Sequence, residues 1–357
     1  MGYNARSALG WITVIAVFIS VATYFLSLLI GFLLVASTQL GSQLQGLTGY
    51  LAIEAFLLIF PTSYPVNGLL LVVISLIIFA ACFGKAVTAN GGFLSGLRIL
   101  SSGSKPRVLP NWLAVMPLLG SSLFVVVLAL TLIQNVEGVS TGSLNTNNPA
   151  ILFASLTLSP IAEEIGFRIS AIGPFVAVLV AIGISRISTT QSRSTTQNPA
   201  IVVLSAFLSP GYAKEQAGLP SVRTSGLKGI SKVEWVALVF TSTVFGAYHI
   251  LSGAGWGPGK FLTAALAGFV LGIVYLSYGA YADILLHWFF NFYLYSYSVF
   301  TGFNGVFVTF GDFAVLGTLA LGVWGIIIGI KWSLEKKPQQ IGPTPFSHVG
   351  DYPPPTV

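Results

Sequence analysis

The chain has 357 residues, of which 54% are hydrophobic and 7% charged, and its mean hydropathy is +0.86. Soluble domains carry about 25% charged residues, so this composition excludes an ordinary soluble globular protein. Its 13% aromatic content and long apolar runs exclude an intrinsically disordered one. The net charge of +6 does not indicate nucleic-acid binding, because several basic residues lie in short loops between apolar runs, where they orient membrane proteins. The composition predicts an integral, multi-pass membrane protein in contact with a lipid bilayer.

Eight apolar runs are long enough to cross a bilayer as helices, which need about 20 mainly apolar residues each. They cover Trp11–Ala36, Asn67–Gly84, Asn111–Gln134, Asn148–Arg168, Glu234–Leu251, Phe261–Tyr278, Tyr281–Phe300 and Val306–Ile330. We therefore predict an all-α, polytopic membrane protein of about eight transmembrane helices.

Three shorter apolar runs do not fit the spanning length. Leu51–Phe60 and Ala200–Leu208 are typical of re-entrant or interfacial segments. Pro174–Ile184 follows the pair Gly173-Pro174, which breaks or kinks a helix. This third run is either a half-helix or the beginning of a longer, tilted helix.

Basic residues in the loops predict which side of the membrane each loop faces. The loop after the second span carries four of them, whereas the loop Asn135–Pro149 carries none, so the former is predicted to be cytoplasmic and the latter external. The four are Lys85, Arg98, Lys105 and Arg107. Lys331, Lys336 and Lys337 place the C-terminal tail on the cytoplasmic side as well.

Two acidic residues near the end of the fourth span require an explanation, because a charge at membrane depth costs several kcal/mol. Glu163 and Glu164 are followed at once by Arg168 in the string EEIGFR. Glu164 and Arg168 are four residues apart with the acid first, which favours an ion pair on a helix. Glu163 points about 100° away on the helix and has no such partner in sequence, and Gly166 leaves its face open.

Two of the three histidines lie in apolar helices. His249 shares a helix face with Phe245, and His287 shares one with Asn291. Asp283, one turn before His287, is placed to orient its ring. Together with the acidic pair, these residues predict a polar cavity within the membrane. Each motif alone is more often structural than functional, with odds of about 60–70% for packing or ion pairing.

The ordered set EExxxR, FxxxH and HxxxN on separate membrane helices resembles the CPBP family, which contains the type II CAAX prenyl endopeptidases and the bacteriocin-processing and immunity proteins. The pattern matches Glu163, Glu164 and Arg168, then Phe245 and His249, then His287 and Asn291. It covers about Asn148–Phe300. The stretch between Glu163 and His249 is longer than the family's usual single hairpin, and we assign the excess to an insertion over Ser185–Lys232.

The resemblance implies an intramembrane endopeptidase that cleaves a membrane-associated peptide or protein, prenylated in part of the family. Glu163 and His249 would activate a water, and His287 and Asn291 would stabilise the oxyanion. Glu164 and Arg168 would support the helix. We favour a reaction without metal or cofactor, because no close pair of histidines exists in sequence, and we expect the protein in the plasma membrane.

The domain division follows from the resemblance and the apolar runs. We predict N-terminal transmembrane helices over residues 1–147 and a CPBP-like catalytic core over 148–300. A last transmembrane helix over 301–331 and a disordered, Pro-rich tail over 332–357 complete the chain.

Two alternatives remain open from the sequence. Glu163, His249 and His287 could supply three zinc ligands with water as the fourth, although no close pair of histidines exists in sequence. Intramembrane acids and histidines also mark ion paths, which would fit a non-catalytic immunity or transport protein. A further question is depth, because straight helices would place His249 near the external side and Glu163 nearer the cytoplasm. The two meet only if the Gly-rich stretch Ser252–Gly259 dips into a protein-lined cavity.

Overall fold

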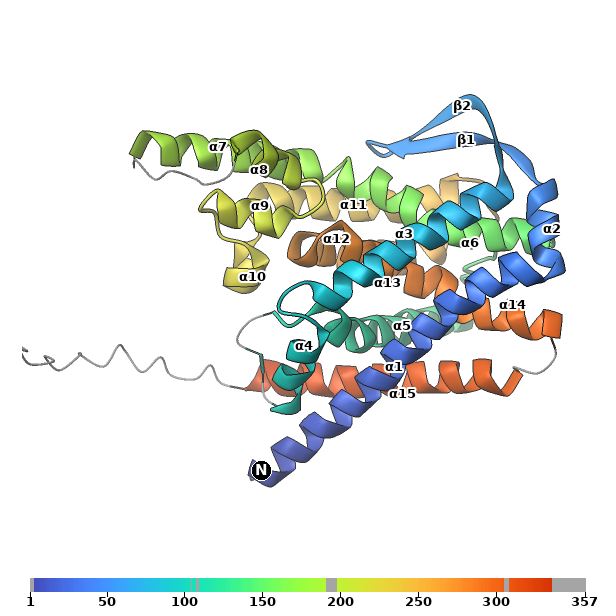
Figure 1. Cartoon of the computed structure of the whole chain (residues 1–357), viewed down its shortest axis with the longest axis horizontal. Coiled ribbons are helices and arrows are strands. Elements are labelled where there is room, and N and C mark those ends of the chain that lie inside the picture. The colour runs from blue at the N-terminus through green and yellow to red at the C-terminus, as the bar shows by residue number, and fades with distance from the viewer. Residues whose placement is uncertain (1–2, 104, 107–108, 191–197, 305–307, 336–357) are drawn as a thin grey trace, which may run out of the picture.

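The computed structural model describes residues 3–103, 105–106, 109–190, 198–304 and 308–335, which form a bundle of long helices with a two-stranded hairpin at one end (Figure 1). Most of the predicted tail, with His348, lies outside the described residues. The helices, including the π-helical segments η1 and η3 and the 3₁₀ segment η2, are α1 (Tyr3–Ser37), α2 (Gln39–Gly46), α3 (Gly68–Thr88), α4 (Phe93–Ser101), α5 (Trp112–Val136), α6 (Pro149–Glu164), η1 (Ile165–Ile169), α7 (Gly173–Thr190), α8 (Pro199–Ser205), α9 (Pro210–Gln216), α10 (Val222–Ser225), η2 (Gly226–Gly229), α11 (Lys232–Leu251), α12 (Lys260–Tyr278), α13 (Ala280–Trp288), η3 (Phe289–Tyr293), α14 (Leu294–Asn304) and α15 (Val308–Leu334).

Seven helices in the described part of the chain are long and apolar enough to cross a membrane. They coincide with the predicted spans except for Tyr281–Phe300. That segment is helical, as α13, η3 and α14, but it is not among the seven. The all-α, polytopic membrane fold is confirmed, whereas the count of eight spans is not.

The segment α13–η3 lies at the centre of the bundle, which explains its lower hydropathy. Residues 282–289 are all buried in the protein. The Trp288 ring packs edge-on against Tyr24 of α1 and Phe83 of α3, at centroid distances of 5.9 and 5.1 Å. A helix surrounded by protein can carry polar residues that would be costly in lipid.

The helices begin at polar caps that satisfy backbone donors which lipid could not. Asn67, Asn111 and Asn148 accept hydrogen bonds from the first backbone N–H groups of α3, α5 and α6. Ser231 and Glu234 form a capping box at the beginning of α11. The predicted spans that correspond to α3, α5, α6 and α11 accordingly begin within two residues of these helices.

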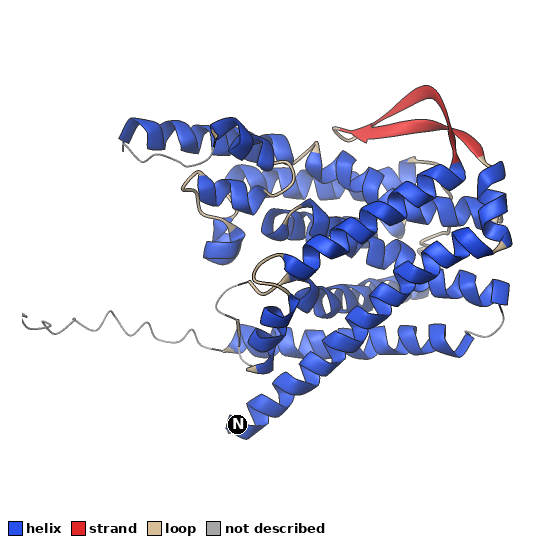
Figure 2. Ribbon diagram, viewed as in Figure 1, coloured by secondary structure: helices blue, strands red, loops and turns tan. Residues whose placement is uncertain are grey.

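The run Leu51–Phe60, expected as a re-entrant or interfacial segment, instead belongs to an antiparallel hairpin of β1 (Thr48–Ala55) and β2 (Leu58–Asn67) (Figure 2). Two prolines in β2, Pro61 and Pro65, disfavour a helical conformation for this segment, because proline lacks a backbone N–H donor and its ring clashes with the preceding turn of a helix. The other two short runs are helical. Pro174–Ile184 lies in α7, which begins at Gly173, and Ala200–Leu208 contains most of α8.

The segment Ser185–Lys232, predicted as an insertion, packs against α11, α12 and the beginning of α13. The buried ammonium of Lys214 in α9 lies 2.7 Å from a carboxylate oxygen of Glu234 in α11. The Tyr275 hydroxyl of α12 donates to the Phe207 carbonyl at 2.8 Å, and the Ala280 N–H donates to the Leu208 carbonyl at 2.9 Å. In Figure 1, α8–α10 and α4 lie at the end of the bundle opposite the hairpin.

Candidate active site

The first motif lies where α6 passes into the π-helical turn η1. Single π-helical turns are rare and are often found at functional sites. Arg168 donates to Glu164 at 3.0 Å, and both side chains are fully buried, which confirms the predicted ion pair. Arg168 also donates to the Gly268 carbonyl of α12 at 3.0 Å. A Cβ at Gly268 would lie 2.9 Å from the Phe245 ring, so glycine permits this close approach.

Phe245 links the first and second motifs. Its ring lies under the Arg168 guanidinium, with 4.6 Å between the guanidinium carbon and the ring centroid. The same ring packs edge-on against His249 at 4.7 Å, so Phe245 and His249 share a face as predicted. Nδ1 of His249 lies 2.9 Å from the Phe245 carbonyl oxygen, which can only accept. Nδ1 therefore carries the hydrogen, and Nε2 is the acceptor in the neutral ring.

His287 connects the first and third motifs. Its Nδ1 lies 2.7 Å from Oε1 of Glu164, and its Nε2 lies 3.6 Å from Oε2 of Glu163. Asn291 donates through its amide to Ser159 at 2.7 Å and lies 3.2 Å from Nε2 of His287. The π-helical turn η3 contains Asn291, so the first and third motifs each end in such a turn.

Asp283 does not orient the His287 ring, contrary to the prediction. Glu164, from another helix, occupies Nδ1 of His287 instead. Oδ1 of Asp283 accepts from the Ile284 backbone N–H at 2.8 Å, and its Oδ2 has no hydrogen-bond partner among the described residues. Asp283 is nevertheless fully buried beside this network.

Glu163 differs from Glu164 as the sequence suggested. Its side chain is 12% exposed, and its buried Oε2 atom accepts no hydrogen bond within the described part of the chain. Its electrostatic neighbours are His287, Glu54, Glu164 and Arg168. A carboxylate without a fixed partner is available to bind a proton or a water.

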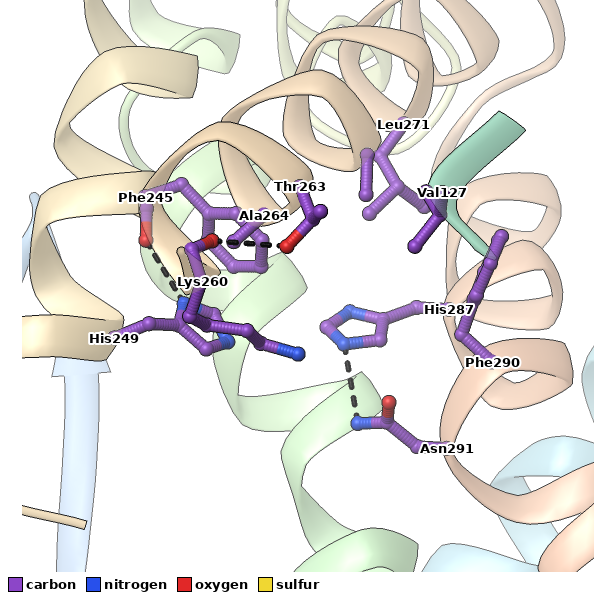
Figure 3. Close-up of a pocket in the computed structure, with 11 residues that line it drawn as sticks. Val127, Phe245, His249, Lys260, Thr263, Ala264, Leu271, His287, Phe290 and Asn291 are labelled. Carbon is purple, nitrogen blue, oxygen red and sulfur yellow. Dashed lines mark hydrogen bonds between the residues drawn. The ribbon is translucent and has the colours of Figure 1, made fainter. Parts of the chain in front are cut away.

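A small cavity of about 70 Å³ joins the two histidines (Figure 3). This volume accommodates a few water molecules. His249, His287 and Asn291 line it, together with Lys260 at the beginning of α12. In Figure 3 the Lys260 side chain extends between the two histidine rings. Its ammonium also lies 4.0 Å from the centroid of the Trp256 ring.

Two loops hold Lys260 and Trp256 beside this cavity. The Gly257 N–H donates to the Thr141 carbonyl at 2.9 Å, and the Gly259 N–H donates to the Ser140 carbonyl at 3.0 Å. The stretch Ser252–Gly259 thus packs against the loop between α5 and α6. His249, at the end of α11, lines the same cavity as His287, whereas Glu163 is not among the lining residues.

The sequence did not identify Glu54 of β1 as part of this region. The hairpin docks on η1, with the Leu57 N–H donating to the Gly166 carbonyl at 3.2 Å. A Cβ on Gly166 would lie 3.0 Å from the Glu54 Cβ, so the face that Gly166 was expected to leave open is covered by the hairpin. Tyr248 donates to Glu54 at 3.4 Å, and burial raises the pKa of the Glu54 carboxyl. The feature of the sequence that could have identified Glu54 is that it is an acidic residue within the apolar run Leu51–Phe60.

Within the described residues, no three His, Cys, Asp or Glu side chains are grouped closely enough to hold a metal ion. Such a group is therefore not formed in this structure by the three possible zinc ligands, Glu163, His249 and His287.

A comparison with protein families supplies independent information on the same segment. Residues 145–293 match the family model of the type II CAAX prenyl endopeptidase Rce1-like domains. No curated protein and no solved structure matches the chain. The matched segment contains all three motifs that form the polar cluster. Residues 145–293 of this integral, multi-pass membrane protein are thus similar to the Rce1-like domains, and the match supports the resemblance to the CPBP (CAAX protease) family.

Proposed function

We propose that the Rce1-like domain, which marks the chain as a CAAX-type intramembrane endopeptidase, hydrolyses peptide bonds with a water held by Glu163 and His249. A general base needs a free lone pair within reach of the water. Oε2 of Glu163 has no hydrogen-bond partner among the described residues, and Nε2 of the neutral His249 ring is an acceptor. The observation that carries the proposal is this unpartnered carboxylate oxygen, which lies 3.6 Å from Nε2 of His287, a residue that lines the cavity together with His249.

In this proposal Glu163 transfers one proton from the water to the leaving nitrogen. Glu163 takes a proton from the water while the water oxygen attacks the carbonyl carbon of the peptide bond. The former carbonyl oxygen then carries the negative charge of a tetrahedral intermediate. Glu163 returns its proton to the leaving nitrogen as the C–N bond breaks, which leaves a carboxylic acid and an amine. Nε2 of His249 accepts a hydrogen bond from the second O–H of the water and orients it, and this hydrogen stays on the attacking oxygen.

The developing oxyanion requires donors on the opposite side of the cavity. We propose His287 and Asn291 for this role, as the motif implied, and add Lys260. The Nδ1 of His287 lies on the Glu164 carboxylate and its Nε2 faces the Asn291 amide, so His287 donates to the oxyanion only when Nε2 also carries a hydrogen. An amide has two N–H donors, and those of Asn291 are directed at Ser159 and His287, so Asn291 serves the oxyanion only after one of these bonds is released. Lys260 needs no such release.

Glu164, Arg168 and Phe245 act as positioning residues in this proposal. Glu164 binds both the Arg168 guanidinium and the His287 ring, and Phe245 packs against Arg168 and His249. Each histidine is thereby fixed by a residue of the first or second motif. Geometry fixed in advance lowers the cost of reaching the transition state. We assign the catalytic core to residues 148–300, with the N-terminal helices 1–147 and the last helix 301–331 as its support.

The proposed substrate is a membrane-associated peptide that carries a prenyl group, in keeping with the match to the prenyl endopeptidase model, and the proposed location is the plasma membrane. The test uses the purified full-length protein in liposomes with a farnesylated peptide and its unmodified counterpart. We expect cleavage of the farnesylated peptide at one bond, identified by mass spectrometry. No cleavage of either peptide would count against the proposal. Equal cleavage of both peptides would show that the prenyl group is not required for recognition of the substrate.

A further inference from the structure

A second polar cavity, of about 330 Å³, lies at the end of the bundle opposite the hairpin. Three parts of the chain line it. Lys85 comes from the end of α3, Arg223 from α10 in the insertion, and Tyr278 and Tyr281 from the junction of α12 and α13. This cavity is separate from the site described above, which lies at the other end of α11 and α12.

The charges of this second cavity favour an anion. None of the lining residues is acidic, and two are basic, Lys85 and Arg223. Glu215 is the nearby acid, and it lies 3.5 Å from Nε of Arg223. Lys85 has no ion pair with the described residues. Glu215 offsets the charge of Arg223 alone, so Lys85 leaves the cavity with a net positive charge for a ligand.

Two hydroxyl groups in the same cavity lack partners. Tyr278 is 8% exposed, and neither its hydroxyl nor that of Tyr281 has a hydrogen-bond partner within the described part of the chain. Buried polar groups are nearly always hydrogen-bonded, so an unpaired buried hydroxyl calls for a specific explanation. Tyr278 has Tyr281 and Arg223 as its electrostatic neighbours, which places two donors beside a guanidinium. This grouping suits an oxyanion with several acceptor atoms.

The position of the cavity indicates where such an oxyanion comes from. Lys85 and Tyr278 lie in the last turns of two helices that are long and apolar enough to span a membrane. The ends of spanning helices lie at the level where lipid headgroups meet water. The neighbouring helix α8 exposes Ile201 and Leu204, which are 61% and 66% exposed. An apolar surface next to a basic, hydroxyl-lined cavity matches a lipid with acyl chains and an anionic headgroup.

We infer that this cavity binds the phosphate of an anionic phospholipid headgroup. Arg223 and Lys85 neutralise its charge, and the hydroxyls of Tyr278 and Tyr281 donate to its oxygens. The lipid connects the insertion to α3 and to the beginning of α13, the helix that carries His287 six residues after Tyr281. The inference does not depend on the proposed function, because it concerns binding and stability alone.

The experiment uses the purified full-length protein in neutral detergent and follows its thermal unfolding and its lipid adducts by native mass spectrometry. The probes are dioctanoyl-phosphatidylglycerol, dioctanoyl-phosphatidylcholine and inorganic phosphate. We expect saturable stabilisation by the phosphatidylglycerol, with a smaller effect of the other two. Stabilisation by inorganic phosphate at the same concentration would overturn the lipid as the source and assign the cavity to free phosphate. No saturable effect of any probe would overturn the site.

Matched variants separate this cavity from general surface charge. Arg223→Gln and the double variant Tyr278→Phe/Tyr281→Phe should each weaken binding about tenfold or more, because a hydrogen bond to a charged group exceeds the ~1.4 kcal/mol that corresponds to tenfold. Lys228→Gln removes an exposed charge in the neighbouring segment η2 and should leave binding unchanged. The Tyr→Phe variant keeps the packing, so it remains informative if Arg223→Gln fails to fold. Equal weakening by Lys228→Gln and Arg223→Gln would overturn the inference.

Discussion

Nδ1 of His287 lies 2.7 Å from Oε1 of Glu164, although the two residues are 123 positions apart in the chain. The same Glu164 oxygen accepts from Arg168 at 3.0 Å. One buried carboxylate oxygen thus joins the EExxxR helix to the HxxxN helix. Glu163, the next residue, is left without a hydrogen bond to its Oε2 from the described residues and faces Nε2 of the same histidine. The two adjacent acids therefore have different environments and, in our account, different roles.

Glu164→Gln should destabilise the protein strongly. The change leaves the fully buried Arg168 without its counter-ion, and breaking a buried pair in this way costs about 3–5 kcal/mol. The measurement is thermal unfolding of the purified protein in detergent. Glu163→Gln is the matched control, since that side chain has no ion pair with Arg168, and its unfolding temperature should stay near the wild-type value. Equal unfolding temperatures for Glu164→Gln and wild type would remove the structural role of the pair.

Lys260→Met should lower kcat about 10²-fold or more with little change in KM, because loss of one oxyanion donor typically costs 10²–10³-fold in turnover. Lys260→Arg keeps the positive charge between the two histidines and should recover part of the rate. If Lys260→Met turns over like wild type, the lysine has no part in stabilising the oxyanion. The contact with the Trp256 ring would then be its main role.

Asn291→Asp tests the third motif most sharply. The change keeps the shape of the side chain but replaces two donors with acceptors and places negative charge where negative charge must develop. We expect kcat to fall further than in Asn291→Ala, whose loss should be about 10²–10³-fold. Near-normal turnover of Asn291→Asp would restrict Asn291 to its hydrogen bond with Ser159.

A strong chelator should leave activity intact if Glu163 and His249 activate the water without a metal. Metal analysis of the purified protein should then find no stoichiometric zinc. Activity that is lost with chelator and restored by zinc would instead make Glu163, His249 and His287 ligands, as three protein ligands plus water are typical of catalytic zinc.

The sequence predicts the parts of this molecule that depend on local physics. The lengths of the apolar runs in the sequence predicted the positions of the spanning helices. The spacing of Glu164 and Arg168 predicted their ion pair, because residues four apart on a helix lie on the same face. The pairing of Phe245 with His249 follows from the same rule and is confirmed.

Contacts between distant segments could not be predicted in this way. Asp283 was the nearest acid to His287 in sequence, whereas the structure uses Glu164 from another helix. Lys260 is brought beside the histidines by hydrogen bonds between two loops, which no periodicity encodes. The feature of the sequence that could have drawn attention to Lys260 is its position at the beginning of an apolar helix, on the external side, where loops were expected to lack basic residues. The hairpin with Glu54 was missed because its apolar residues resemble a short membrane segment.

The central claim is that Glu163 is the general base, and the most direct measurement is cleavage of the farnesylated peptide by Glu163→Gln in liposomes. We expect a loss of about 10²–10⁴-fold in kcat, the usual contribution of general acid–base catalysis, with an unchanged unfolding temperature. His249→Ala should show a similar loss. Glu54→Gln makes the same chemical change in a neighbouring carboxyl and should retain activity within about tenfold, since its hydrogen bond to Tyr248 is long at 3.4 Å. Wild-type turnover by Glu163→Gln would contradict the account.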